Sequence, residues 1–290
     1  MKKTLALAAL AFASLPLRLS AQDVGPRSGA LVIVGGAMED KIILERFIEL
    51  AGGPEAPIVI IPTAGEADRY DQYYPEVGDW REAGVEDVTV LHTRDRNVAN
   101  SDEFVAPIRK ARGVWFPGGR QWRLADAYLD TRTELELHAV LDRGGVIGGS
   151  SAGATIQGSY LVRGDTKNNT IMMGDHVEGF GFLKNAAIDQ HLLTRNRHFD
   201  LIPVIEKYPH LLGIGIDEDT AVVVQGDRFE VIGRSVVAIY DRTRTVGQDG
   251  RFYFLRPGDT YDLKERQARR RAYSEEPFEM VKEEPWPDRD

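Results

Sequence analysis

The sequence predicts an α/β fold in which helices cover both faces of a doubly wound, mostly parallel sheet. The first observation is a series of short apolar runs without polar alternation, of which residues 31–34 are the clearest. The second is that helical periodicity, as in 41–51, separates these runs as far as residue 150. Strands that are buried on both faces and joined by helices form parallel sheets, and their functional sites lie beyond the carboxyl ends of the strands.

The expected elements follow one another in the order that such a sheet requires. The strand at 31–34 runs into Gly35 and Gly36, and the helix at 41–51 stops at Gly52, because glycine readily takes the left-handed conformation that ends helices. Further strands are expected at 58–61, 88–91, 113–116 and 146–147, with helices at about 70–83, 103–111 and 131–142 and another that opens at Ser151.

From about Thr220 the pattern changes to short strands joined by tight turns. These strands are expected at 221–224, 228–232, 236–240 and 251–254, and they predict a small antiparallel C-terminal extension of the same sheet domain. A single domain of the flavodoxin-like, three-layer kind is therefore expected over 28–262. The highly charged residues 263–290 are expected to form a surface tail.

The first 21 residues have the features of a secretory signal peptide. Lys2 and Lys3 are basic, the apolar run at 4–17 is too short to span a bilayer comfortably, and Ala21 ends a segment that resembles a cleavage site. An uncleaved anchor is the alternative, which the length of the run disfavours. We expect a secreted or periplasmic protein that is not bound to a membrane after cleavage.

Composition limits the classes of function. A net charge of -9 argues against a nucleic-acid partner, because phosphate binding needs a concentrated positive face. The chain has no cysteine, which excludes disulfides, thiol nucleophiles and thiolate metal sites. The glycines at 35–36 lack the complete dinucleotide fingerprint, so no nucleotide is expected there, and we expect neither a cofactor nor a metal ion.

The segment GGSSAGA at 148–154 predicts a nucleophile elbow with Ser151 as the catalytic serine. An apolar strand precedes it, a helix follows from about Ala152, and the small residues allow a sharp turn. N–H groups at the start of that helix would stabilise an oxyanion. A plain helix N-cap is the alternative, but the strand before and the helix after favour the elbow.

A catalytic serine needs a base and an acid that orients it. His191 is the favoured base among six histidines because it follows an apolar entry and precedes Arg195 and Arg197, with His92 and His176 as alternatives. 

The orienting acid would come from the acidic run at 217–219. The residues alone leave Asp217 and Glu218 open, since they would point to opposite faces of an extended chain. Separately, Gly118 and Gly119 follow the expected strand at 113–116, where their N–H groups suit an oxyanion hole or a ligand cradle. A plain turn before a helix is the alternative for this loop.

Taken together, these segments resemble the cyanophycinase branch of the S51 serine peptidases, hydrolases on the class I glutamine-amidotransferase-like fold. The resemblance covers about residues 31–240 and is specific because all blocks occur in order. The blocks are VGGA at 34–37, IIPTA at 60–64, FPGGRQ at 116–121, GSSAGA at 149–154, DQH at 189–191 with RNR at 195–197, and GIGIDE at 213–218.

The resemblance implies a catalytic triad and resolves both open choices. Ser151 would attack the carbonyl, His191 would take its proton, and Glu218 would hold the imidazole in the productive tautomer. The implied oxyanion hole consists of the backbone N–H groups of Gly119 and Ala152. The implied substrate-pocket positions are Gln121, Asp189, Gln190, Arg195 and Arg197.

The implied substrate is cyanophycin, a poly-aspartate chain that carries arginine on each side-chain carboxyl. Enzymes of this branch release β-aspartyl-arginine dipeptides from its end and need no metal. One departure concerns the pocket: the family has a third arginine near position 200, where this chain has Asp200, so one charge changes from +1 to -1. A pocket altered in this way would lose affinity for a carboxylate-rich backbone and gain affinity for an amine or guanidinium.

Two alternatives to a cyanophycin-degrading exopeptidase remain. An isoaspartyl or acidic dipeptidase of the same family is plausible because of Asp200, and a catalytically silent binding module is disfavoured by the intact Ser151, His191 and Glu218. A glutamine amidotransferase is excluded, because its nucleophile would be a cysteine. Folds of this kind often pair, so the expected partners are a peptide substrate and a second copy of the chain.

Overall fold

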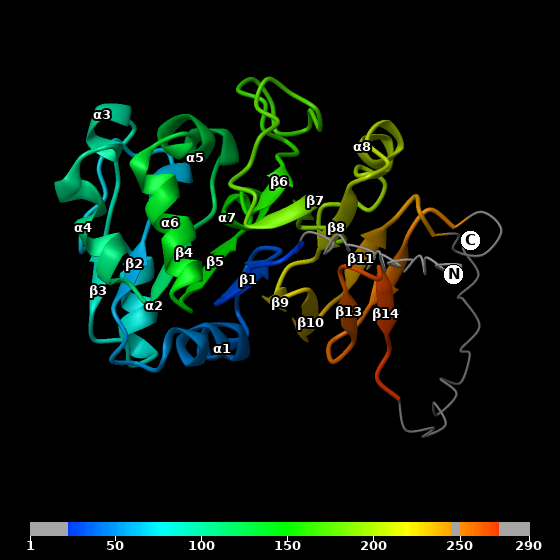
Figure 1. The fold of residues 1–290 in the computed structure, drawn as a ribbon, viewed down its shortest axis with the longest axis horizontal. Coiled ribbons are helices and arrows are strands. Elements are labelled where there is room, and N and C mark those ends of the chain that lie inside the picture. The colour runs from blue at the N-terminus through cyan, green and yellow to red at the C-terminus, as the bar shows by residue number, and fades with distance from the viewer. Residues whose placement is uncertain (1–22, 245–249, 273–290) are drawn as a thin grey trace, which may run out of the picture.

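The computed structural model describes residues 23–244 and 250–272, and the expected signal peptide and most of the expected tail lie outside them. Within these residues the chain forms two sheets and the helices that cover them (Figure 1). None of the described helices is long and apolar enough to cross a membrane.

The larger sheet contains the parallel strands that the sequence predicts. Its order is β14 (Gln267–Arg269), β13 (Thr260–Asp262), β10 (Arg228–Gly233), β9 (Thr220–Gln225), β1 (Ala30–Val34), β5 (Val146–Ser150), β4 (Gly113–Phe116), β2 (Ile58–Ile60) and β3 (Val88–Val90). The five neighbouring strands β1, β5, β4, β2 and β3 are all parallel. On the other side of β1, the strands β9, β10, β13 and β14 continue the sheet in antiparallel pairs. The predicted α/β fold is confirmed.

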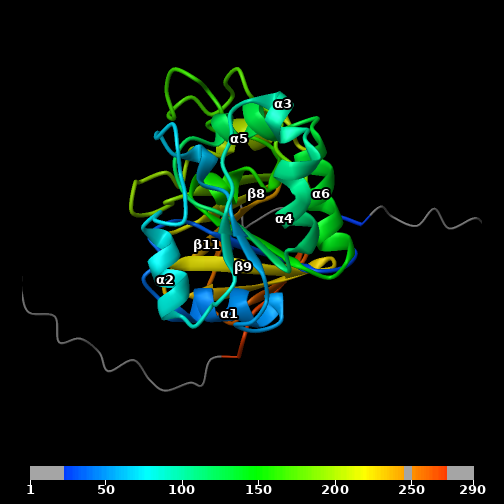
Figure 2. The ribbon, with the colours of Figure 1, turned by 90° about the vertical axis from the view of Figure 1, so that its left-hand side faces the viewer.

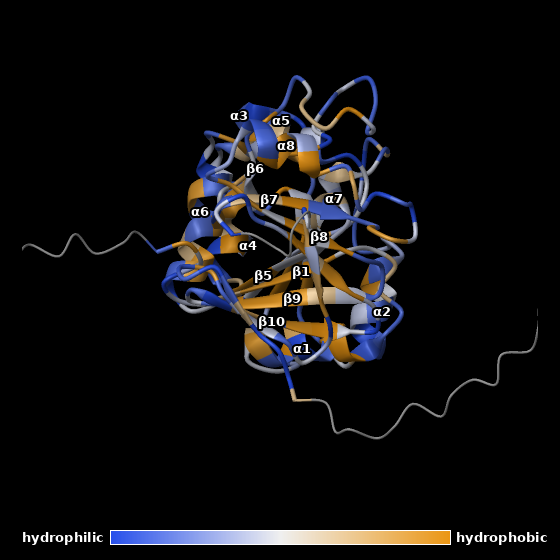
Figure 3. Cartoon of the chain, turned by 90° about the vertical axis from the view of Figure 1, so that its right-hand side faces the viewer, coloured by the Kyte–Doolittle hydropathy of each residue, from blue (hydrophilic) through white to orange (hydrophobic). Residues whose placement is uncertain are grey.

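Helices cover both faces of the parallel strands, as Figure 2 shows. The helices α1 (Lys41–Ala51) and α2 (Glu76–Glu82) lie on one face, and α4 (Asp102–Lys110) and α6 (Arg132–Asp142) on the other. Neighbouring residues of β1 divide between the two cores: Val32 is buried in the cluster that contains Phe47, and Leu31 in the cluster that contains Leu137. Both faces of the strands are therefore apolar, which Figure 3 shows as orange strands in the interior.

Local chemistry explains where the first two helices begin and end. The Asp40 side chain accepts the N–H of Ile42 and caps α1, and Gly52 ends it with a φ of 109°. The predicted start of the helix at 70–83 is wrong, because α2 begins only after Pro75. A proline disfavours helical conformation in the residue before it, so the chain from residue 70 remains in turns up to that point.

A second sheet was not expected from the sequence. Its order is β12 (Tyr253–Leu255), β11 (Val237–Tyr240), β8 (Leu212–Ile216), β7 (Leu183–Gln190) and β6 (Gly158–Tyr160). The three strands from β6 to β8 are parallel, and β11 pairs antiparallel with β8. The strands expected at 236–240 and 251–254 thus belong here and not to the extension of the first sheet, because strand pairing depends on distant partners that a local pattern does not reveal.

Residues 263–272, the described part of the expected tail, include a strand that was not expected. Residues 263–290 were interpreted as a surface tail, but β14 pairs with β13 and closes the edge of the larger sheet. Ala268 packs partly buried against the core, while Gln267 and Arg269 are exposed. An edge strand with charged outward side chains resists pairing with other chains, which explains the polar composition that suggested a tail.

Candidate active site

Ser151 lies at a sharp turn between β5 and α7 (Ala152–Thr155). Its backbone angles are φ 56° and ψ -110°, a strained conformation for a residue other than glycine. The Ser151 N–H donates to the carbonyl of Val34 at the end of β1. A Cβ at Gly153 would lie 1.8 Å from the Phe116 carbonyl oxygen, so this approach of α7 to β4 requires glycine. The predicted strand, turn and helix are present, although the helix is a single turn.

His191 reaches Ser151 from the end of β7. Its Nε2 lies 2.8 Å from the Ser151 Oγ, and the backbone N–H of His191 donates to the Gly35 carbonyl. Gly36 lies against the ring: a Cβ there would lie 2.2 Å from Cε1 of His191, and the φ of Gly36 is 133°. The loop after β1 therefore holds the imidazole in place.

The first two acidic residues after β8 contact different groups. Glu218 Oε1 hydrogen-bonds Nδ1 of His191. Asp217 instead accepts the N–H groups of Leu193 and Thr194 and the Ser235 hydroxyl. Asp217 thus fixes the segment that follows His191, and Glu218 is the acid that contacts the imidazole.

The electrostatic surroundings favour a neutral imidazole. Burial lowers the pKa of His191 below its ordinary value, the hydrogen bond that Nδ1 donates to Glu218 opposes this, and the nearby guanidinium groups of Arg195 and Arg197 lower it further. A neutral histidine can accept a proton from a serine hydroxyl, which an imidazolium cannot.

The two alternative bases are engaged elsewhere. His92 Nδ1 lies 2.9 Å from the Thr63 hydroxyl, and His176 lies between the carboxylates of Asp126 and Asp175. Across the residues that the structure describes, neither of these histidines contacts Ser151.

The glycine loop after β4 passes beside Ser151. A Cβ at Gly118 would lie 3.5 Å from the Ser151 Cβ. Gly119 has a φ of 140° and approaches the carbonyl of Ala64, at the end of η1 (Pro62–Ala64), so closely that a Cβ would lie 2.2 Å from its oxygen. The same carbonyl accepts the N–H of Arg120. η1 therefore supports the loop that carries the expected oxyanion donor.

The expected substrate-pocket residues do not all face the same space. Arg195 is exposed, and Arg197 is buried with its Nη1 2.7 Å from the Gln190 Oε1. Gln121 and Asp189 are buried as well, and the Gln121 amide donates to the Val162 carbonyl. Any contribution of Gln121 or Asp189 to substrate binding is thus through the residues that they hold.

Arg163 is a residue that the sequence analysis missed. Its side chain is 1% exposed, and its Nε and Nη2 bind both carboxylate oxygens of Asp189 at 2.7 and 2.9 Å. Its Nη2 also binds Asp200 at 2.6 Å. Arg163 follows the apolar pair Leu161 and Val162 and opens a polar loop, so nothing in the sequence marks its side chain as buried.

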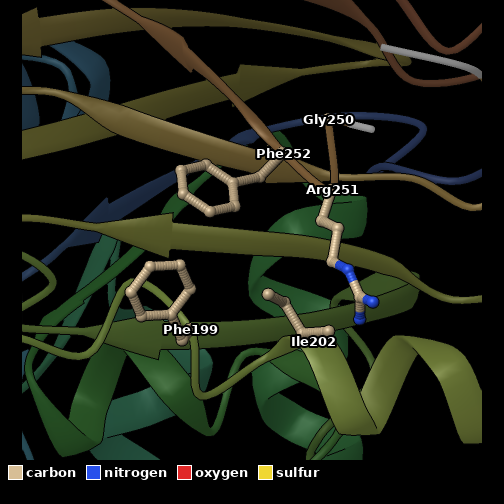
Figure 4. A pocket seen from close by; sticks show the side chains of 5 residues that line it. All are labelled: Phe199, Ile202, Gly250, Arg251 and Phe252. Carbon is tan, nitrogen blue, oxygen red and sulfur yellow. The ribbon is translucent and has the colours of Figure 1, made fainter. Parts of the chain in front are cut away.

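The structure offers no metal centre in the parts of the chain that it describes, where no three acidic or histidine side chains cluster in a suitable way. A cavity of about 530 Å³ lies beyond the site, lined by Phe199, Ile202, Gly250, Arg251 and Phe252 (Figure 4). Two of its lining residues, Phe199 and Ile202, belong to the segment that follows Arg197.

Comparison with known proteins agrees with this geometry. The model of peptidase family S51 matches residues 31–232, which is more than half of the chain. The chain belongs to peptidase family S51. The resemblance noted in the sequence is thereby confirmed, and this S51 protein is a serine-type peptidase.

Relatives of this S51 chain include cyanophycinases. One from Geminocystis herdmanii (strain PCC 6308) is 36% identical over 230 residues, which cover 74% of this chain and 81% of the relative. Another from Thermosynechococcus vestitus (strain NIES-2133 / IAM M-273 / BP-1) is 31% identical over 281 residues, 89% of this chain and 86% of the relative.

Solved structures show the same fold. A peptidase from an acI-B1 Actinobacterium has a TM-score of 0.62 at 25% identity and covers 82% of this chain and 98% of its own. A putative peptidase E from Listeria monocytogenes EGD-e has a TM-score of 0.51 at 19% identity, with 71% of this chain and 99% of its own covered, and shares the fold.

Proposed function

We propose that this S51 peptidase is a secreted serine exopeptidase of the cyanophycinase type, which hydrolyses cyanophycin or related β-aspartyl peptides with Ser151, His191 and Glu218. The observation that carries the proposal is the continuous hydrogen-bonded chain from the Ser151 Oγ through both nitrogens of His191 to Glu218. A serine, a base and an orienting acid in this geometry are the parts that acyl transfer requires.

The reaction proceeds in two steps, formation of an ester on Ser151 and its hydrolysis. The Ser151 Oγ attacks the amide carbonyl carbon while its proton passes to Nε2 of His191, and the proton then goes to the leaving amine as the C–N bond breaks. Water attacks the resulting ester, His191 takes its proton, and the proton returns to Ser151 as the acid is released. Glu218 stabilises the imidazolium that forms transiently in each step.

The oxyanion of each tetrahedral intermediate would be bound by the N–H groups of Gly119 and Ala152. Two features support this assignment: the loop that carries Gly119 passes beside Ser151, and Ala152 opens α7 directly after it. Among the hydrogen bonds of the described residues, neither N–H has a protein acceptor. Donors that are already oriented and unpaired stabilise developing charge without reorganisation.

The substrate assignment rests on the cyanophycinase relatives and on the guanidinium groups near the triad. Arg195 and Arg197 lie close enough to lower the pKa of His191, and they suit the free carboxylate of an aspartyl residue whose side chain is in the peptide link. The same two arginines also suit other isoaspartyl or acidic dipeptides, which remain the alternative.

The deciding experiment offers the purified protein insoluble cyanophycin and a panel of β-aspartyl dipeptides. Clearing of the polymer with release of β-aspartyl-arginine is the expected result, and cleavage of dipeptides without clearing selects the alternative. Ser151→Ala serves as the control and should abolish all hydrolysis while leaving thermal unfolding unchanged. Undiminished hydrolysis by that variant would overturn the triad.

Secretion is supported by the basic and apolar composition of residues 1–21. Expression of the full chain in a bacterium, followed by N-terminal sequencing of the periplasmic or extracellular protein, tests it. We expect a mature chain that begins near Gln22. A cytoplasmic product that retains residues 1–21 would contradict secretion.

A further inference from the structure

An ion-pair cluster lies beside the proposed catalytic site and contains two carboxylates for one guanidinium. Arg163 binds both oxygens of Asp189 and one oxygen of Asp200, and its Nη1 donates to the Asn169 carbonyl. The three charged side chains sum to a net charge of -1. Arg163 therefore neutralises only one of the two carboxylates that it contacts.

The carboxylate that Arg163 holds by only one oxygen is the one that is open to solvent. The Asp189 side chain is 0% exposed, and both of its oxygens are bound by Arg163. The Asp200 side chain is 40% exposed, and only its Oδ2 meets Arg163. In the part of the chain that the structure describes, no side chain donates a hydrogen bond to the Asp200 Oδ1, which leaves this oxygen to a ligand or to water.

The cluster is placed next to the proposed substrate pocket. The Asp200 N–H donates to the Arg197 carbonyl, and the Arg197 guanidinium lies on Gln190, which directly precedes His191. The charges of Asp189 and Asp200 both act on Arg197, and the charge of Arg197 acts on His191. Anionic and cationic groups thus lie side by side, within a short distance of the imidazole.

We propose that Asp200, held in place by Arg163, is a specificity-determining residue that binds the cationic group of the substrate, while Arg195 and Arg197 bind its carboxylate. This inference rests on the proposed function. It assigns the site a dipolar substrate, a β-aspartyl peptide whose second residue carries a guanidinium or ammonium group. Arg163 acts as a positioning residue that fixes the Asp200 side chain before the substrate arrives, which lowers the entropy cost of binding.

Arg163 also explains how this chain accommodates an acid where the family resemblance predicts an arginine. An arginine at position 200 would place its positive charge beside the buried guanidinium of Arg163. An aspartate at that position accepts a charge-assisted hydrogen bond from it instead. The negative charge at position 200 therefore has a buried positive partner in Arg163.

The test compares two peptides that differ only in charge. Citrulline has the length and shape of arginine but is neutral, so the two substrates each join two β-aspartyl-arginine units through the aspartyl backbone amide, and the terminal unit carries either arginine or citrulline. The ratio of kcat/KM for the arginine form over the citrulline form isolates recognition of the cation. We expect D200N to lower this ratio roughly fivefold to tenfold, as the loss of a partly exposed charged hydrogen bond does. D200E, which keeps the carboxylate, should restore part of the preference, and added salt should weaken it in the wild type.

Asp102 offers a matched control. It is an exposed aspartate that also pairs with arginines, Arg109 and Arg132, but on α4 and α6. D102N makes the same change of charge and should leave the ratio as in the wild type. An unchanged ratio in D200N, or an equal loss for both peptides, would overturn the proposal, since an equal loss is what a merely structural role predicts.

A measurement that needs no turnover separates this inference from the proposed function. If the wild type cleaves neither peptide, the proposed function fails, and the reaction of Ser151 with a fluorophosphonate still reports the state of the site. Free arginine should then protect Ser151 better than free citrulline in the wild type, and the two should protect equally in D200N. Equal protection in the wild type would overturn the role of Asp200.

Discussion

At the scale of single residues, the candidate site depends on close approaches that only small residues allow. Gly36 lies against the ring of His191, Gly153 against the Phe116 carbonyl, and Gly119 against the Ala64 carbonyl. Each of these contacts places a side chain or a backbone donor of the proposed site, so a methyl group in any of them would displace part of that site by about an ångström or more.

Gly36→Ala should lower kcat at least a hundredfold, because its Cβ would lie 2.2 Å from Cε1 of His191 and would push the imidazole away from Ser151. Gly52→Ala is the matched control: its φ is also positive, 109°, but no atom lies within 4 Å of the new Cβ. That variant should lose about 1 kcal/mol of stability and keep its activity. Steady-state kinetics and thermal unfolding on both variants provide the comparison, and equal activities would contradict the role of Gly36.

The titration of His191 predicts the acid side of the pH profile. Its pKa is lowered chiefly by burial, and in the proposed mechanism the neutral form is the active one. Activity should therefore persist below pH 6.5, the ordinary value, and be lost only as the pH falls through the lower pKa of the folded protein. A kcat/KM profile whose acid limb lies above pH 6.5 would be inconsistent with this environment.

Substitution of Asp217 should change KM and kcat in a different proportion from substitution of Glu218. Asp217→Asn keeps one acceptor oxygen but weakens its hold on Leu193 and Thr194, which fix the segment that carries Arg195 and Arg197. We expect KM to rise several-fold with a smaller change in kcat, whereas Glu218→Gln should lower kcat by a hundredfold or more. The split between KM and kcat distinguishes a positioning residue from one that contacts the reacting histidine.

At the scale of elements, the site is assembled from the carboxyl ends of strands in two sheets. β5 supplies Ser151, β7 supplies His191, and β8 leads into Glu218, while the loop after β4 brings Gly119. The segment between β6 and β7 is tied at three places to α5 (Gln121–Tyr128) and the residue before it: Arg120 donates to the Asp165 carbonyl, Gln121 donates to the Val162 carbonyl, and His176 hydrogen-bonds Asp126.

His176 makes the attachment of the segment between β6 and β7 to α5 dependent on pH. Burial opposes protonation, but hydrogen bonds with Asp175 and Asp126 outweigh it and raise the pKa of His176. The stabilisation is thus fully present below about pH 6.5 and is lost as the pH rises through the raised value. Hydrogen exchange of residues 163–177 should quicken over that range in the wild type and show no such step in His176→Gln. A step that survives in the variant would assign it to another group.

At the scale of the whole molecule, Arg266 connects the two sheets near their outer edges. Arg266, just before β14 of the larger sheet, pairs with Asp241, which follows β11 of the second sheet and has a side chain that is 0% exposed. Removal of the arginine leaves a buried carboxylate without its counter-charge. Arg266→Met should therefore cost about 2–4 kcal/mol of unfolding free energy, by denaturant titration, while Arg269→Met on the exposed side of β14 should cost little. Equal losses would contradict this role.

The sequence by itself determined the elements of the parallel sheet, the elbow at Ser151 and the family, because these depend on local patterns: apolar runs, glycines at turns and short motifs in order. It left the choice between Asp217 and Glu218 to a resemblance, and it missed Arg163 and the second sheet. These were decided by contacts between residues far apart in the chain. Arg163 meets Asp189 and Asp200, which lie 26 and 37 positions away. Arg163 opens a polar loop in the sequence, so only the packing of the chain buries its side chain and decides which carboxylates it meets.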